Sequence, residues 1–133
     1  MPIQKEVTFN ASPARIYQLL SQSDQFAAAT GRSASIGPEG ETFSLFGGFI
    51  TGRNIELVPG RRVVQAWRSQ DWGPGVYSLV RFTLTGGDGG TRMVVTHDAY
   101  PEGASPMYPT WHQHLSENWP AFYFNPFRRY LAA

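Results

Sequence analysis

Apolar and polar residues alternate along most of this chain, with the period of two that is typical of a strand buried on one face. Residues 3–10 begin the pattern, with Ile3, Lys5, Val7 and Phe9 on one side and polar residues between them. Later strands are predicted over residues 32–36, 41–46, 49–58, 61–68, 77–85 and 91–99. Turn signals separate several of them: Gly37-Pro38-Glu39-Gly40, Pro59-Gly60 and Gly86-Gly87-Asp88-Gly89-Gly90. This order is typical of antiparallel hairpins.

Two short helices are predicted between the first and second strands. Ser12 is a suitable cap for the first helix, and Pro13 suits its first helical position, where the missing N–H costs nothing. The second helix, over residues 23–29, presents Phe26 and ends at Gly31, because glycine readily adopts the left-handed conformation that closes a helix.

The last third of the chain carries large apolar residues at helical spacing. They are Leu115, Trp119, Phe122, Tyr123, Phe127 and Tyr130. Pro120 and Pro126 interrupt this pattern, because each proline removes a backbone hydrogen bond from a helix. We therefore expect either a helix that begins near Asn118 or a helix with a kink.

The alternation also assigns one face of the sheet to the interior. That face carries Val63, Gln65 and Trp67, then Ser78, Val80, Phe82 and Leu84, then Met93, Val95 and His97. A sheet with one apolar face must bury that face, and the C-terminal helix is the candidate cover. The order of the elements predicts an α+β helix-grip fold in a single domain over residues 1–133. In this fold a curved antiparallel sheet surrounds a long C-terminal helix, with two short helices after the first strand.

Several short sequence motifs follow one another along the chain in an order that is also found in a known family. They are Phe9-x3-Pro13-x2-Ile16-Tyr17, Gly52, Glu56-Leu57-Val58-Pro59, Trp67-Arg68, Trp72, Gly75, Ser78-x-Val80-x-Phe82-x-Leu84, Gly90-Thr91-Arg92, Thr96-His97, Trp119-x2-Phe122-Tyr123 and Pro126-Phe127-x2-Tyr130-Leu131. In this order the chain resembles the activator of heat-shock protein 90 ATPase homologue family, a branch of the START-like (Bet v 1-like) superfamily. The resemblance implies the same helix-grip fold. Trp111 departs from the family pattern as an extra aromatic residue, and Asn54 and Gln65 place amides where apolar residues are usual.

Charge and composition narrow the classes of function. A net charge of +1, from 11 basic and 10 acidic residues, gives no patch for a nucleic-acid backbone. Because there is no cysteine, the chain has no disulfide, zinc–thiolate site or cysteine nucleophile. No stretch resembles a signal peptide or approaches the roughly 18 apolar residues that a membrane span needs. We expect a cytoplasmic protein that binds neither nucleic acid nor membrane.

No residue pattern favours catalysis or a metal site. His112 and His114 lie two positions apart, so on a helix they point about 200° away from each other, which favours two surface or rim histidines. Ser78 lacks the Gly-x-Ser-x-Gly sequence of a nucleophile elbow. His97 faces inward, where a neutral histidine with a hydrogen bond is favoured over a proton-transfer role. We predict no catalytic residue, no metal and no cofactor.

Aromatic residues are abundant, with nine Phe, six Tyr and four Trp. They either fill a thick core or line a cavity between sheet and helix, and we predict the cavity. Asn54, Gln65 and His97 would then be the few polar groups that orient a ligand. The predicted lining is Asn54, Gln65, Trp67, Ser78, Val80, Phe82, Met93, Val95, His97, Trp119, Phe122 and Tyr123. The predicted function is binding of a small apolar or amphipathic molecule.

Two other functions stay open. The family resemblance implies a co-chaperone-like regulator of a heat-shock protein 90 ATPase. That role in the eukaryotic activator also involves an N-terminal domain that this chain lacks, so we expect no appreciable stimulation by this domain alone. A START-superfamily cyclase- or hydrolase-like enzyme would use His97 with an acidic partner. We also expect a homodimer, formed through exposed aromatic residues at Trp72, Tyr108 and Trp111.

Overall fold

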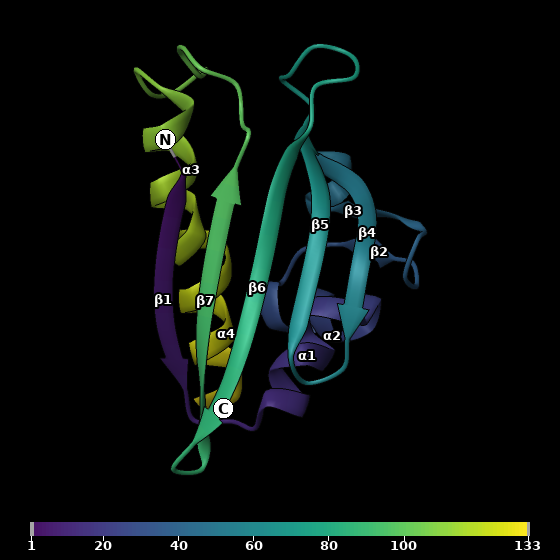
Figure 1. Ribbon diagram of the computed structural model, residues 1–133, viewed down its shortest axis with the longest axis vertical. Helices are drawn as coiled ribbons and strands as arrows, with labels where there is room; N and C mark the ends of the chain where they lie inside the picture. Colours follow the sequence, from purple (N-terminus) through teal and green to yellow (C-terminus); the bar gives the residue numbers. More distant parts are fainter. Residues whose placement is uncertain (1, 133) are drawn as a thin grey trace.

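The computed structural model describes residues 2–132 and has the predicted α+β helix-grip fold, with a curved antiparallel sheet around the C-terminal helices (Figure 1). The strands are β1 (Ile3–Phe9), β2 (Ala34–Ile36), β3 (Thr42–Leu45), β4 (Ile50–Val58), β5 (Arg62–Ser69), β6 (Ser78–Gly87) and β7 (Gly90–Asp98). The helical segments are α1 (Pro13–Ser21), α2 (Ser23–Thr30), η1 (Phe46–Gly48), α3 (Trp111–Trp119), η2 (Pro120–Phe124) and α4 (Asn125–Ala132).

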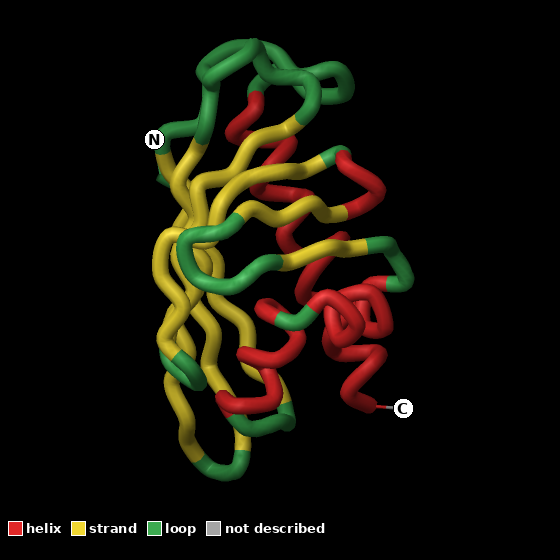
Figure 2. Tube along the Cα trace, turned by 90° about the vertical axis from the view of Figure 1, so that its right-hand side faces the viewer, coloured by secondary structure: helices red, strands yellow, loops and turns green. Residues whose placement is uncertain are grey.

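The sheet is a continuous meander with one added strand. Its order is β1-β7-β6-β5-β4-β3-β2, so β2 to β7 follow one another and β1 joins the far edge beside β7. All helices lie on one side of this sheet (Figure 2). In Figure 1, α3 and α4 lie behind β1 and β7, whereas α1 and α2 lie behind the lower ends of β4 and β5. The concave face is therefore covered by two groups of helices, which meet where α2 packs against α4.

The predicted inward face of the sheet is confirmed by register and burial. Trp67 pairs with Ser78, and Val80 pairs with both Gln65 and His97, so these side chains share one face of three neighbouring strands. All five are at most 5% exposed. Burying this face against the helices is the main source of stability for such a sheet.

The predicted start and end signals of the first two helices are confirmed. The Ser12 hydroxyl accepts a hydrogen bond from the backbone N–H of Arg15 at 3.2 Å, and Pro13 is the first residue of α1. Gly31 ends α2 with a φ of 72°, and its N–H donates to the carbonyl of Ala27. These caps satisfy backbone groups that would otherwise lack partners at the helix ends.

The β6–β7 connection is tighter than the five-residue loop that its composition indicates. Gly86 pairs with Thr91 and Gly87 pairs with Gly90, so the ladder continues almost to the tip. Only Asp88 and Gly89 remain in the turn, with φ values of 45° and 79°. Two consecutive positive φ angles match the twist of a two-residue hairpin turn, and Asp-Gly is a preferred sequence for it.

Of the two predictions for the C-terminal helix, a start near Asn118 is wrong, because the helix begins earlier. It starts at Trp111, where the Thr110 hydroxyl accepts from the N–H of Gln113 at 3.1 Å, and not near Asn118. The interruption expected at Pro120 takes the form of a π-helical segment, Pro120–Phe124, in which the N–H of Asn125 donates to the carbonyl of Pro120. Pro120 has no N–H to donate back to the preceding turn, so the regular α-helical ladder is broken there.

Candidate functional site

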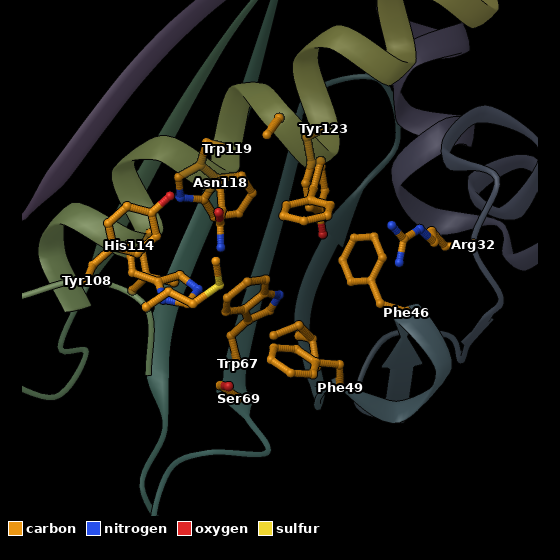
Figure 3. Close-up of a pocket in the computed structure, with 15 residues that line it drawn as sticks. Arg32, Phe46, Phe49, Trp67, Ser69, Tyr108, His114, Asn118, Trp119 and Tyr123 are labelled. Atoms are coloured by element: carbon orange, nitrogen blue, oxygen red, sulfur yellow. The ribbon is translucent and has the colours of Figure 1, made fainter. Parts of the chain in front are cut away.

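A groove of about 510 Å³ opens between the sheet and the C-terminal helix (Figure 3). It lies where neither helical cover closes over the sheet, at the end of β5 and the start of β4. Its lining comprises Arg32, Phe46, Phe49, Ile50, Trp67, Ser69, Met107, Tyr108, His114, Leu115, Asn118, Trp119, Ala121, Phe122 and Tyr123. The volume lies within the range of about 300–1,000 Å³ that small-molecule sites occupy.

The π-helical segment forms one wall of the groove. Ala121, Phe122 and Tyr123 all come from η2, and Asn118 and Trp119 come from the last turn of α3. A π-helical turn contains more residues than an α-helical turn, so it changes which side chains face the sheet after Pro120. Such segments occur frequently at functional sites, which makes this wall a candidate for binding.

The opposite end of the groove contains a strained aromatic residue. Phe46 has a φ of 56°, a conformation that a bulky residue rarely adopts. Its ring packs at 5.6 Å from that of Phe26, 5.8 Å from Phe122 and 6.1 Å from Tyr123, measured between ring centroids. Strained residues that the surroundings hold in place cluster at ligand sites, and Phe46 lies in the wall of this one.

Three aromatic side chains line one side of the groove. The rings of Trp67 and Trp119 stack with centroids 5.5 Å apart at 27°, and Tyr123 packs 4.8 Å from Trp119. All three side chains are at most 5% exposed. A surface of this kind favours flat apolar ligands, because aromatic groups gain both buried area and stacking contacts there.

Polar atoms in this surface lack partners. The indole N–H groups of Trp67 and Trp119 are buried, and within residues 2–132 neither reaches an acceptor. Burial raises the pKa of the Tyr123 hydroxyl, and the neighbouring Trp67 indole opposes this only in part. The Tyr123 hydroxyl lies on the side of its ring that faces Trp67 (Figure 3). A ligand atom that accepts a hydrogen bond would relieve this loss.

His114 differs from its predicted position on the surface or rim. It is 7% exposed, and its Nδ1 lies 2.9 Å from the hydroxyl of Ser105. Its ring stacks 4.8 Å from that of Trp111. Burial lowers the pKa of His114, while the Asp71 carboxylate acts weakly in the opposite direction. His114 therefore stays neutral near pH 7 and serves as one end of the groove.

His112 is exposed, as predicted, and does not join His114 at a common site. Within the part of the chain that the structure describes, no three His, Asp or Glu residues are arranged to hold a metal ion.

The twelve residues predicted to line a cavity divide into two groups. Trp67, Trp119, Phe122 and Tyr123 line the groove. The other eight lie in the packed core and do not line it: Asn54, Gln65, Ser78, Val80, Phe82, Met93, Val95 and His97. The alternation correctly places them on the inward face, but the helices fill the centre of that face and leave space only near its edge.

The two interior amides have a structural role. Gln65 donates from Nε2 to Oδ1 of Asn54 at 3.0 Å, and Asn54 donates from Nδ2 to the carbonyl of Gly37 at 2.7 Å. This chain of hydrogen bonds fixes the loop before β3 to the middle of the sheet. The pairing of β4 with β5 shifts register just after Asn54, which is where the amide lies.

His97 and Ser78 form a buried pair that does not reach the groove. Nε2 of His97 lies 2.7 Å from the Ser78 hydroxyl, which also donates to the carbonyl of Trp67 at 3.0 Å. Burial lowers the pKa of His97 to about 3. The Ser78 hydroxyl thus has a backbone acceptor beside the imidazole, and both side chains are enclosed in the core. The acidic partner that an enzyme using His97 would need is absent among residues 2–132.

The prediction of an exposed aromatic patch for a dimer contact is wrong for two of its three residues, which are buried. Trp72 and Trp111 are 5% and 6% exposed, and they pack edge to face with ring centroids 5.5 Å apart. Each covers the other, so neither is free to contact a second copy. Tyr108 is half-buried and lines the groove.

Several groove residues escaped prediction from the sequence. Arg32, Phe46 and Phe49 are end residues of the strands predicted over residues 32–36, 41–46 and 49–58, and the structure places all three just outside β2, β3 and β4. Met107 and Tyr108 lie in the loop before α3. The unusual run Phe46-Gly47-Gly48-Phe49 was the one available signal, because two glycines between aromatic residues indicate a bend that presents both rings.

No helix within residues 2–132 has the length and apolar character needed to cross a membrane.

The curved sheet, the C-terminal helix and the groove between them define a helix-grip domain of the Bet v 1-like class. Within this class, the family described as "Activator of Hsp90 ATPase homolog 1-like protein" matches residues 10–132. The match covers most of the chain, and the chain belongs to this family.

Individual relatives and solved structures agree with this assignment. An activator of 90 kDa heat shock protein ATPase homolog from Dictyostelium discoideum is 37% identical over 78 residues, which is 58% of this chain and 20% of that protein. The chain thus spans far less than the length of that relative.

Two solved structures share the fold. The crystal structure of an HSP90 activator from Plasmodium falciparum has a TM-score of 0.89 at 19% identity, covering 99% of this chain and 96% of that one. The solution structure of the Aha1 dimer from Colwellia psychrerythraea has a TM-score of 0.77 at 22% identity, covering 94% and 92%.

Proposed function

We propose that this chain binds a small apolar or amphipathic molecule in the groove between sheet and helix. The observation that carries the proposal is the combination of a groove of about 510 Å³ that aromatic side chains line with buried N–H groups that lack acceptors. Protein interiors normally close at the density of organic crystals and pair their buried polar groups. Both departures from this rule coincide in the groove, which supports a site that a ligand completes.

Titration with N-phenyl-1-naphthylamine tests this proposal. This dye is flat, apolar and uncharged, and its fluorescence rises in apolar surroundings. We expect saturable binding of one dye molecule per chain. An unsaturable signal, or no signal, contradicts ligand binding in the groove.

A second proposal concerns a chaperone: the chain stimulates the ATPase of a heat-shock protein 90 in the cytoplasm. The relatives' names support this more directly than they support ligand binding, whereas the geometry supports ligand binding. The Plasmodium falciparum structure titled an HSP90 activator is 96% covered by this chain. That coverage removes the reason for expecting a single domain of this size to be inactive, and we propose stimulation in place of that expectation.

The ATPase of a purified heat-shock protein 90 measures this second function. We expect turnover to rise with the concentration of this chain and to saturate. A helix-grip domain from outside the family, added at equal concentration, controls for non-specific protein effects. Turnover that stays at its basal value across the titration contradicts the proposal.

We also propose self-association, through a contact surface that differs from the one predicted from the sequence. Because Trp72 and Trp111 are buried, the contact must use other exposed apolar residues, such as Tyr77 and Leu79, which are 49% and 40% exposed. The Colwellia psychrerythraea structure is titled a dimer. Sedimentation velocity across micromolar concentrations should show a species that grows heavier with concentration, and a constant monomer refutes it.

A further inference from the structure

Arg32 brings a positive charge to one end of the groove without a partner for it. It lies between α2 and β2, it is exposed, and it lines the groove. Within residues 2–132, no carboxylate lies within ion-pair distance of its guanidinium, and the ion pairs found there involve only Arg62 with Glu56 and Arg92 with Glu6.

The ring of Phe122 positions this guanidinium. The central carbon of the guanidinium lies 5.8 Å from the centroid of Phe122, which is a cation–π contact. A guanidinium carries five N–H donors, and no ion pair engages those of Arg32 within residues 2–132. The arginine is thus held at the groove by an aromatic neighbour while its donors stay available.

The ring contacts place this charge at one end of the aromatic surface. Phe122 contacts Phe46 at 5.8 Å, and Phe46 contacts Tyr123 at 6.1 Å, between centroids. Tyr123 in turn packs on Trp119, which stacks on Trp67. Figure 3 shows the same order, with Arg32 beyond Phe46 as seen from Trp67.

The buried N–H of Trp67 also points to oxygen atoms in the ligand. The Trp67 side chain lines the groove and is 5% exposed. Its N–H is buried and lacks an acceptor within the described residues. A purely hydrocarbon ligand would leave this donor unsatisfied, whereas a ligand oxygen would accept from it.

We propose that the groove selects a flat aromatic or polycyclic molecule that carries an oxyanion, with the apolar body on Trp67, Trp119 and Tyr123 and the anionic group toward Arg32. The inference rests on the proposed ligand binding and adds the chemical class of the ligand. An aromatic body gains ring contacts with these side chains, whereas a flexible alkyl chain loses more conformational freedom on binding. The arginine selects the charge.

Three competitors of bound N-phenyl-1-naphthylamine separate these features. They are 2-naphthoate, which is flat and anionic, 2-naphthylmethanol, which is flat and neutral, and decanoate, which is flexible and anionic. We expect 2-naphthoate to displace the dye at roughly tenfold lower concentration than 2-naphthylmethanol, as a charge-assisted hydrogen bond would give. Stronger displacement by decanoate overturns the flat class.

Arg32→Gln tests the assignment of charge to this residue. It should remove the advantage of 2-naphthoate over 2-naphthylmethanol, with each competition referred to the affinity of the variant itself for the dye. Because Arg32 is exposed, the variant is expected to fold normally. Arg129→Gln removes the same charge from an exposed position on α4, outside the groove. It should leave the concentrations at which 2-naphthoate and 2-naphthylmethanol displace the dye unchanged.

The outcomes separate the two levels of the argument. If the dye itself does not bind, ligand binding in the groove fails and this inference fails with it. If the dye binds but the two naphthalene competitors are equal, or their difference survives Arg32→Gln, only the anionic class is overturned. Partial recovery of the difference in Arg32→Lys would support a role for the charge at that position.

Discussion

His97 is held neutral by its surroundings. The side chain is 0% exposed, and the rings of Trp67, Tyr100 and Trp119 pack around it at 5.1, 5.5 and 5.6 Å between centroids. Burial lowers its pKa to about 3, because the charged form would lose its hydration without gaining a counter-ion. The side chain thus belongs to the core and gives the fold a dependence on pH.

Between pH 6.5 and about 3 we expect this histidine to destabilise the fold progressively. In that window the unfolded chain binds a proton at His97 and the folded chain does not, so the free energy of unfolding falls as pH falls. The contribution of this residue lowers the free energy of unfolding by about 1.4 kcal/mol for each pH unit. Urea denaturation at several pH values measures it.

The comparison with His97→Gln isolates this contribution, since other groups also titrate in this range. In the variant, the free energy of unfolding should fall with pH by about one proton less than in the wild type. Equal slopes in wild type and His97→Gln would contradict a neutral buried histidine.

Single residues show what the sequence alone could predict. Alternation placed Val80, Phe82 and His97 on the inward face, because period-two patterning reports which side of a strand is buried. It could not tell whether a buried residue borders a groove or a filled core. That difference depends on where the covering helices lie, which no local pattern records. Phe46 and Arg32 were missed for a related reason, since Arg32 lies in the connection between α2 and β2 and Phe46 begins the short helical segment η1.

At the level of elements, one glycine sets how closely β4 and β5 pack. Gly52 pairs with Trp67 and Phe43, and a Cβ atom there would lie 1.9 Å from the carbonyl oxygen of Ala66 and 2.7 Å from the ring of Phe43. The carbonyl belongs to the ladder and has little freedom to move. Only glycine fits this position.

Gly52→Ala is therefore expected to lower the free energy of unfolding by about 3 kcal/mol, as overpacking inside a rigid ladder does. Chemical denaturation followed by circular dichroism gives the value. Gly87→Ala makes the same change in β6, where an added Cβ meets nothing within 4 Å and φ is not positive, and it should cost under about 1 kcal/mol. Similar costs for both variants would refute the close approach at Gly52.

The π-helical segment offers a way to close the groove without touching the core. Ala121 lines the groove and is exposed. Ala121→Phe should fill part of the groove and weaken binding of N-phenyl-1-naphthylamine at least roughly tenfold, while the free energy of unfolding stays within about 0.5 kcal/mol. Ala132→Phe, at an exposed position on α4, should leave dye binding unchanged. Undiminished binding in Ala121→Phe would place the dye elsewhere.

Element order was well predicted, and element ends less so. Strands, caps and hairpin turns depend on local residues, so their positions could be found from the sequence. The start of α3 could not, because Trp111 to Asn118 has a weak apolar pattern, and the helix there is fixed by the Thr110 cap and by packing of Trp111 against Trp72. Proline indicated an interruption at residue 120 but not that it would be π-helical.

For the molecule as a whole, the groove results from incomplete cover. One face of the sheet is shared between α1 and α2 on one side and α3, η2 and α4 on the other, with α2 packing against α4. The remaining space lies above Trp67, bounded by Phe46 and the π-helical segment. The central claim is that this space is a binding site.

Nuclear magnetic resonance of the four tryptophan indole N–H groups tests this claim most directly. Trp67 and Trp119 line the groove, whereas Trp72 and Trp111 do not, so the chain contains its own controls. On titration with N-phenyl-1-naphthylamine, we predict large shifts for Trp67 and Trp119 and little change for Trp72, with assignments from single Trp→Phe variants. Shifts confined to Trp72 and Trp111, or no shift at any of the four, would contradict a binding site in the groove.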